Sequence, residues 1–294
     1  MRQNFLNMSN LRSRYAHCST AVKFFQWLGI MIVSGLAVMF LVVLLFPTPL
    51  GLQSLKLFQA IQSLAIFVMP PFVVAYLWSA RPLEWLGLSS FPSWRITVSA
   101  LLWLLVAIPG INLLAYWNSH ISLPEALSGL EQMMQLMEER AASLTKQFLE
   151  TATVAGLCVN ILVLAFLPAL GEELSFRSVL LRLFGSTSAA IWAMAVIFSA
   201  LHGQFYGFVP RMLMGVVFGY MVVWSGSLWT SVSMHFLNNA LAVVTAYICT
   251  CQGIDVEVLE TFGTGSTAWA GYLSLVLAVV GIVLLKRWVP VWRK

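Results

Sequence analysis

Long apolar stretches separated by short polar segments run through the whole chain. A helix that crosses a bilayer needs about 20 mostly apolar residues. Reading for such runs predicts eight spanning helices, of which the fifth and sixth are the shortest. The expected ranges are 27–46, 61–80, 96–116, 151–184, 189–201, 211–224, 228–248 and 268–285.

The segment 123–150 has a different pattern. Apolar residues recur at alternating steps of three and four from Leu127 to Phe148, and charged residues occupy the other faces. This spacing predicts an amphipathic helix, which lies on the outer interface or against the bundle. The predicted fold is therefore an all-α polytopic membrane protein, with about eight transmembrane helices and an additional outer amphipathic helix.

Composition supports this fold and excludes several other classes of protein. Of the 294 residues, 60% are hydrophobic and 9% are charged, whereas soluble domains carry about 25% charged residues. A cytosolic enzyme, a secreted disulfide scaffold and a disordered chain are excluded. The net charge of +5 is too small and too scattered to indicate nucleic acid as a partner. The expected partner is the lipid bilayer.

We expect one transmembrane domain over residues 27–288, with a chemical core at about 150–248. Residues 1–26 are expected to form a cytoplasmic N-terminal tail, and residues 289–294 a cytoplasmic C-terminal tail. Basic residues at span ends set orientation, because they stay on the cytoplasmic side. Threading eight spans from a cytoplasmic N-terminus leaves most basic flanks inside, so both termini are predicted to be cytoplasmic.

Polar groups inside three of the predicted spans carry the candidate chemistry. An ionisable side chain in a bilayer costs on the order of 2.5–3.5 kcal/mol, so such groups persist when they pair or react. The candidate residues are Glu172, Glu173, Arg177, His202, His235 and Asn239. Counted at about 1.5 Å per residue from the cytoplasmic ends of their helices, Glu172 and Asn239 lie roughly 18 Å deep, and His202 roughly 21 Å. Three helices therefore bring polar groups to a similar level.

Helical spacing indicates which of these side chains share a helix face. Glu173 and Arg177 are four apart with the acid first, which favours an ion pair on one face. His235 and Asn239 are also four apart and share a face. A carboxylate and a neutral histidine can share a water and take its proton, and a second histidine with an asparagine can donate hydrogen bonds to an oxyanion. These residue types are suited to hydrolysis of an amide.

The three motifs, Glu-Glu-x-x-x-Arg, Phe-x-x-x-His and His-x-x-x-Asn, occur in this order between residues 165 and 242. They resemble the CPBP family of CAAX-protease and bacteriocin-processing proteins, which includes Rce1-like type II prenyl endopeptidases. The resemblance implies an intramembrane glutamic-type endopeptidase. It implies that Glu172 activates water with His202. His235 and Asn239 would then hold the substrate carbonyl and its developing charge.

By the same resemblance, Glu173 and Arg177 keep the fourth helix in register. Ser175 and Ser178 stand where many family members have Phe and Gly, next to the motif rather than in it. The implied substrate is a membrane-associated protein or peptide, prenylated or hydrophobic. The implied location is a bacterial cytoplasmic membrane. No cofactor is expected.

Three other interpretations stay open at this point. In a metal-dependent variant, Glu172, His202 and His235 would ligate Zn²⁺ with a water in the fourth position. In a non-enzymatic variant, the chain is a membrane scaffold or bacteriocin-immunity-type protein that retains the motif as structure. Buried Glu and His also form proton relays in transporters, although no inverted repeat supports that function here.

Overall fold

The computed structural model describes residues 13–45, 51–256 and 261–288, and the regular elements in these ranges are all helices. Within these ranges, seven helical stretches are long and apolar enough to cross a membrane, which confirms a polytopic all-α membrane protein. The bounds are α1 (Thr20–Leu45), α2 (Leu52–Gln62), η2 (Ser63–Val68), α3 (Met69–Trp78), α4 (Pro82–Trp85), α5 (Trp94–Ser119), η3 (Glu125–Leu127), α6 (Ser128–Leu149), α7 (Val154–Asn160), η4 (Ile161–Phe166), α8 (Leu167–Glu173), η5 (Leu174–Leu180), α9 (Leu181–Leu183), α10 (Ser188–Leu201), η6 (Phe205–Gly207), α11 (Phe208–Ser225), α12 (Leu228–Gln252), η7 (Gly265–Thr267) and α14 (Ala268–Trp288).

The fifth predicted span, α10, is the short one. Its 14 residues reach about 21 Å at 1.5 Å per residue, less than the roughly 30 Å of a hydrocarbon core. Gly203 ends the helix because it adopts a left-handed conformation (φ +65°), and its N–H donates to the carbonyl of Ala200. The sixth predicted span is longer than expected, because the turn η6 runs directly into α11 and the two together cover 21 residues.

The N-terminal boundary differs from the expectation. Helix α1 begins at Thr20 rather than at residue 27, and the hydroxyl of Ser19 accepts the N–H of Val22 at this end. Residues 20–26 therefore belong to the first helix and not to a tail. Residues 13–19 form turns, in which the N–H groups of Ser13 and Tyr15 donate to the carbonyls of Tyr76 and Leu77. The remaining parts of the predicted tails, residues 1–12 and 289–294, lie outside the described residues.

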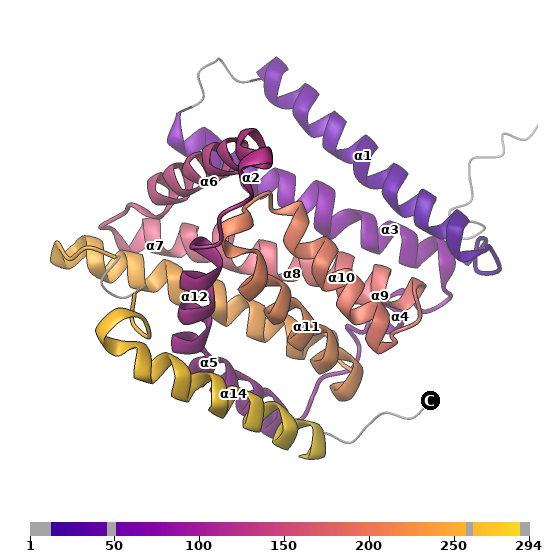
Figure 1. Ribbon diagram of the computed structural model, residues 1–294. Coiled ribbons are helices and arrows are strands. Elements are labelled where there is room, and N and C mark those ends of the chain that lie inside the picture. The colour runs from indigo at the N-terminus through magenta and orange to yellow at the C-terminus, as the bar shows by residue number, and fades with distance from the viewer. Residues whose placement is uncertain (1–12, 46–50, 257–260, 289–294) are drawn as a thin grey trace, which may run out of the picture.

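The helices form three groups, which Figure 1 shows side by side. Helix α1 packs against η2 and α3 on one flank, and α5 packs against α14 on the opposite flank. Between them lie α8, η5, α10, α11 and α12, the helices that carry the polar motifs. The amphipathic helix α6 extends beside this bundle, and among its side chains only Phe148 is buried.

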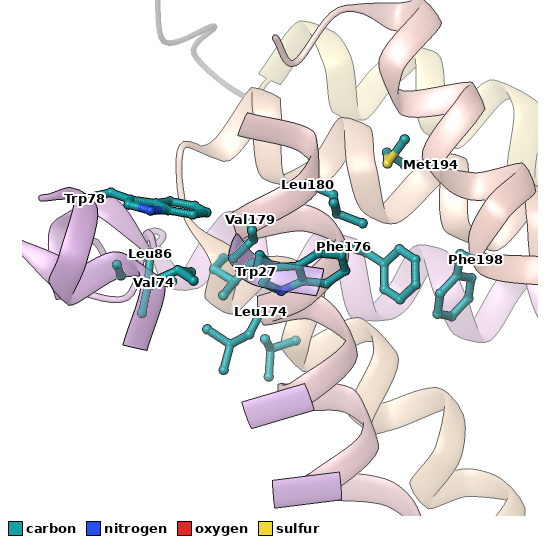
Figure 2. Packing of buried hydrophobic residues seen from close by; sticks show 13 residues of the cluster. Trp27, Val74, Trp78, Leu86, Leu174, Phe176, Val179, Leu180, Met194 and Phe198 are labelled. Atoms are coloured by element: carbon teal, nitrogen blue, oxygen red, sulfur yellow. The ribbon is translucent and has the colours of Figure 1, made fainter. Parts of the chain in front are cut away.

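The fourth span is interrupted by wide turns. Two stretches, η4 and η5, are π-helical, and the first directly precedes the turn that holds Pro168. Proline lacks the N–H that continues an α-helix, so a break in the α pattern is expected there. Every side chain of η5 is buried. Figure 2 shows that Leu174, Phe176 and Val179 of this segment pack in the main apolar cluster with Trp27.

Candidate active site

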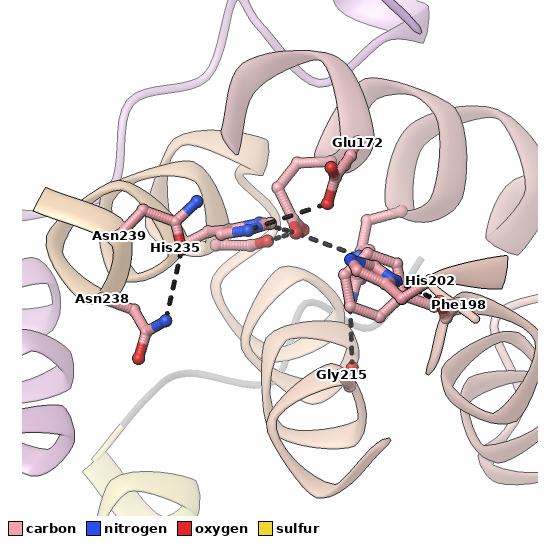
Figure 3. A network of polar contacts seen from close by, with 10 residues as sticks. Glu172, Phe198, His202, Gly215, His235, Asn238 and Asn239 are labelled. Atoms are coloured by element: carbon pink, nitrogen blue, oxygen red, sulfur yellow. Dashed lines mark hydrogen bonds and ion pairs between the residues drawn. The ribbon is translucent and has the colours of Figure 1, made fainter. Parts of the chain in front are cut away.

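Three helices of the central group present the candidate residues (Figure 3). Helix α8 ends with Glu172 and Glu173, and η5 continues to Arg177. His202 caps the C-terminal end of α10. His235 and Asn239 lie one turn apart on α12.

A glycine sets the depth at which α8 packs. A Cβ atom added to Gly171 would lie 2.7 Å from Cβ of Phe67 in η2, which is closer than any side chain tolerates. Only glycine therefore lets α8 approach η2 this closely. The hydroxyl of Ser175 donates to the carbonyl of Phe67 at 3.2 Å and holds the same contact one turn later. The backbone on both sides of Glu172 is fixed in this way.

Glu173 is the buried centre of the polar network. Its side chain has no exposed surface, and its Oε1 lies 3.0 Å from Nη1 of Arg177. The same oxygen lies 2.9 Å from Nδ1 of His235, and Oε2 accepts the hydroxyl of Ser231. A buried carboxylate is costly unless it is paired and hydrogen-bonded, and here three side chains meet that requirement.

Arg177 joins the network to two further helices. Its guanidinium lies 4.5 Å from the ring centroid of Phe198 in α10, and Nη2 donates to the carbonyl of Gly215 in α11 at 3.4 Å. A Cβ added to Gly215 would approach Nη2 to 3.2 Å, so the small residue leaves room for the cation. The pairing of Glu173 with Arg177 thus ties the fourth span to both neighbours.

His235 lies between the two glutamates. Its Nδ1 faces the carboxylate of Glu173, so Nδ1 carries the proton and donates it. Its Nε2 lies 3.8 Å from Oε2 of Glu172, which is too long for a direct hydrogen bond. The ring stacks on Phe218 with centroids 5.5 Å apart. Glu173 and Phe218 therefore fix the ring so that Nε2 points toward Glu172.

The ring of His202 is held by a hydrogen bond at Nδ1. Nδ1 lies 2.8 Å from the carbonyl oxygen of Phe198, and a carbonyl only accepts, so Nδ1 is the protonated nitrogen. In a neutral ring, Nε2 is then a free acceptor. His202 is exposed, and within the described residues no hydrogen bond or ion pair joins it to Glu172. The group in ion-pair range of Glu172 is His235.

Asn239 completes the constellation on α12. Its Oδ1 accepts a hydrogen bond of 3.3 Å from Nδ2 of Asn238, which leaves its own Nδ2 as a donor. In the view of Figure 3, Glu172 lies between Asn239 with His235 on one side and His202 with Phe198 on the other. Glu172 is partly exposed, with 18% of its side chain accessible, whereas the side chain of Glu173 is fully buried. The two adjacent glutamates therefore have different environments.

Sequence reasoning missed several supporting residues. Ser231 is four residues before His235 on the same helix face, and this spacing was the available signal for it. Arg211 donates to the backbone carbonyl of Gln204 at 3.1 Å and to its side-chain oxygen at 3.3 Å. Gln204 in turn donates to Glu138 of α6 at 3.4 Å. These contacts tie the loop after His202 to the amphipathic helix, and no short-range pattern indicates them.

The same side chains were the candidate ligands for a metal ion. In the part of the chain that the structure describes, no group of three or more His, Cys, Asp or Glu side chains is arranged to hold one. The Nδ1 of His235 is already engaged with Glu173, so only its Nε2 is free for another partner.

Comparisons with known proteins bear on the central helices. Residues 154–241 match the family model of Rce1-like type II CAAX prenyl endopeptidases. A Bacillus subtilis (strain 168) protein, named uncharacterized protein YpbD, is 30% identical over 86 residues. That match covers 28% of this chain and 43% of the relative, so less than half of the relative's length is matched. No solved structure matches the chain significantly. The family match confirms the resemblance that the three motifs predicted.

Proposed function

We propose that this chain, whose residues 154–241 form an Rce1-like CAAX-protease domain, is an intramembrane endopeptidase of the glutamic type. The observation that carries the proposal is the pair of glutamates at the end of α8. Glu173 is buried and holds His235 in one orientation, and the partly exposed Glu172 faces the free nitrogen of that ring.

The proposed reaction begins with a water bound by Glu172. The carboxylate and the free Nε2 of His202 are both acceptors, so together they can orient the water and take its proton. The hydroxide adds to the carbonyl carbon of the peptide bond, and the carbonyl oxygen becomes an oxyanion. The proton taken from water passes to the leaving amine as the carbon–nitrogen bond breaks. One water is consumed and two peptide ends result.

The oxyanion would be stabilised from α12. Nδ2 of Asn239 is an available donor, and the protonated form of His235 offers a second N–H at Nε2. The carboxylate of Glu173, 2.9 Å from Nδ1, holds the ring in the orientation that points Nε2 toward Glu172. Donors fixed before the reaction need no reorganisation when the charge develops.

The substrate class follows from the location of the site. The chain is a multi-pass membrane protein, and the substrate proposed for it is a membrane-associated protein or peptide, prenylated or hydrophobic. The proposed location is a bacterial cytoplasmic membrane with both termini in the cytoplasm, because the basic flanks of the spans favour that orientation.

The test is cleavage of a membrane-associated peptide by purified protein. Glu172→Gln keeps the shape of the side chain and removes the base, so we expect a folded protein with no turnover. His202→Ala is expected to have the same effect. Full turnover by either variant would refute the assignment.

His120 offers a matched control for His202. Its Nδ1 lies 2.7 Å from the carbonyl oxygen of Tyr116, four residues earlier, in the same arrangement as His202 with Phe198. His120→Ala is therefore expected to retain activity. A non-enzymatic scaffold would behave differently, because its binding phenotype would survive Glu172→Gln and be lost on changing the exposed surface of α6.

A further inference from the structure

A cavity of about 450 Å³ lies at the end of the bundle where several helices end. It is bordered by the loop after α4, by the end of the fourth span and by the turn between α11 and α12. The lining includes Arg182, Glu84 and four serines, namely Ser89, Ser90, Ser178 and Ser186. Glu172, His202 and His235 do not line this cavity. Arg177 does line it, but the charge of Arg177 is paired with Glu173.

Arg182 is held in place at this cavity. Its guanidinium lies 5.8 Å from the ring centroid of Trp85. A Cβ added to Gly87 would lie 3.3 Å from its Nη2, so the guanidinium lies against the bare backbone of Gly87. Gly87 has a left-handed backbone conformation (φ +75°), which also favours glycine. Both contacts position the planar group without using its N–H donors.

The positive charge of Arg182 has no counter-ion here. Within the described residues, no hydrogen bond or ion pair to Arg182 is formed. The carboxylate of Glu84 borders the same cavity but lies 3.2 Å from Nη1 of Arg81. The three charges sum to +1. A guanidinium that is oriented but unpaired, beside serine hydroxyls, is suited to an anion with several oxygen atoms.

We propose that this cavity binds a phosphate group, with Arg182 as its main ligand. A guanidinium binds phosphate through two parallel hydrogen bonds, and the exposed Ser89 and the half-buried Ser90 add hydroxyl donors. Helix ends lie at the level of lipid headgroups, where phosphate is the abundant anion and basic pockets between helices bind such groups. Leu83 and Phe91, which flank the cavity residues in sequence, are 55% and 75% exposed and offer apolar surface to acyl chains.

The test measures binding of phosphatidylglycerol, phosphatidylcholine and inorganic phosphate to the purified full-length protein. Arg182→Gln is expected to weaken binding of the anionic lipid about tenfold, since it removes charged hydrogen bonds. Arg182→Lys keeps the positive charge but cannot donate two parallel hydrogen bonds, so we expect its affinity for the anionic lipid to be intermediate. Arg95→Gln is the matched control, because Arg95 also lies over a tryptophan, Trp94, at 5.7 Å but does not line the cavity.

The outcomes separate the source of the phosphate from the existence of the site. Loss of lipid binding in Arg182→Gln, with no competition by millimolar phosphate, identifies a lipid headgroup. Binding of inorganic phosphate that depends on Arg182, without lipid binding, identifies a soluble phosphate compound. Equal weakening by Arg95→Gln indicates surface charge alone and overturns the proposal. So does unchanged binding in Ser89→Trp, which fills the cavity without altering charge.

Discussion

Glu173→Gln tests the buried network under the proposed active site. The substitution keeps the shape of the side chain and removes its charge. Arg177, which is only 3% exposed, is then left as a buried cation without its carboxylate. His235 loses the negative charge that faces its Nδ1 at 2.9 Å. Stability and activity should therefore fall together.

The expected loss of stability follows from burial. Removing one partner of a buried ion pair costs about 3–5 kcal/mol, because the other charge stays buried and unpaired. A large domain loses about 2–4 °C in Tm per kcal/mol, so we expect Tm to fall by roughly 10 °C. Replacing Ser231 with Ala removes one hydrogen bond to the same carboxylate and should cost less, about 1–3 kcal/mol.

The assay is thermal unfolding of the purified protein in detergent. Glu84→Gln is the matched control, because Glu84 pairs with Arg81 at a similar distance of 3.2 Å but both side chains are well exposed. An exposed ion pair contributes about 0–1 kcal/mol, so this variant should unfold close to the wild type. If Glu173→Gln and Glu84→Gln lower Tm equally, the argument from burial is wrong.

Three further predictions concern the same helices. Asn239→Ala should lower kcat about 10²–10³-fold with little change in KM, because it removes a donor to the oxyanion; an equal loss confined to KM would contradict this role. Gly171→Ala should destabilise by about 1–3 kcal/mol, because its Cβ would lie 2.7 Å from Cβ of Phe67, whereas Gly129→Ala should be neutral or stabilising because nothing lies within 4 Å of it. Chelator treatment should leave peptide cleavage unchanged and elemental analysis should find no stoichiometric zinc; loss of activity that zinc restores would favour the metal-dependent variant.

The membrane spans were predictable from sequence because a bilayer imposes a minimum apolar length. The interruptions of the fourth span were harder to predict from sequence. Pro168 indicated a break, but the π-helical turns of η4 and η5 change the rotation of one half of the span against the other. No pattern of apolar residues reveals that rotation, since η5 is buried on all sides.

For the candidate site, the sequence indicated which polar residues lie inside apolar helices but not which of them contact one another. Their position inside apolar runs made Glu172, His202 and His235 candidates, because a bilayer makes such residues costly. The partner in ion-pair range of Glu172 is His235 and not His202. That choice depends on how α8, α10 and α12 rotate about their axes, which is set by packing between helices far apart in sequence.

The wholly buried segment η5 has a consequence for how a peptide reaches Glu172. Directly beyond Glu173, the seven residues Leu174–Leu180 are all buried, so the chain is densely packed next to the proposed reactive carboxylate. In the proposed reaction, a peptide would therefore reach Glu172 from the side on which Glu172 and His202 are accessible. Cleavage would then occur at one depth along the helix bundle. The substrate segment around the bond to be cut would have to be extended and non-helical to reach Glu172.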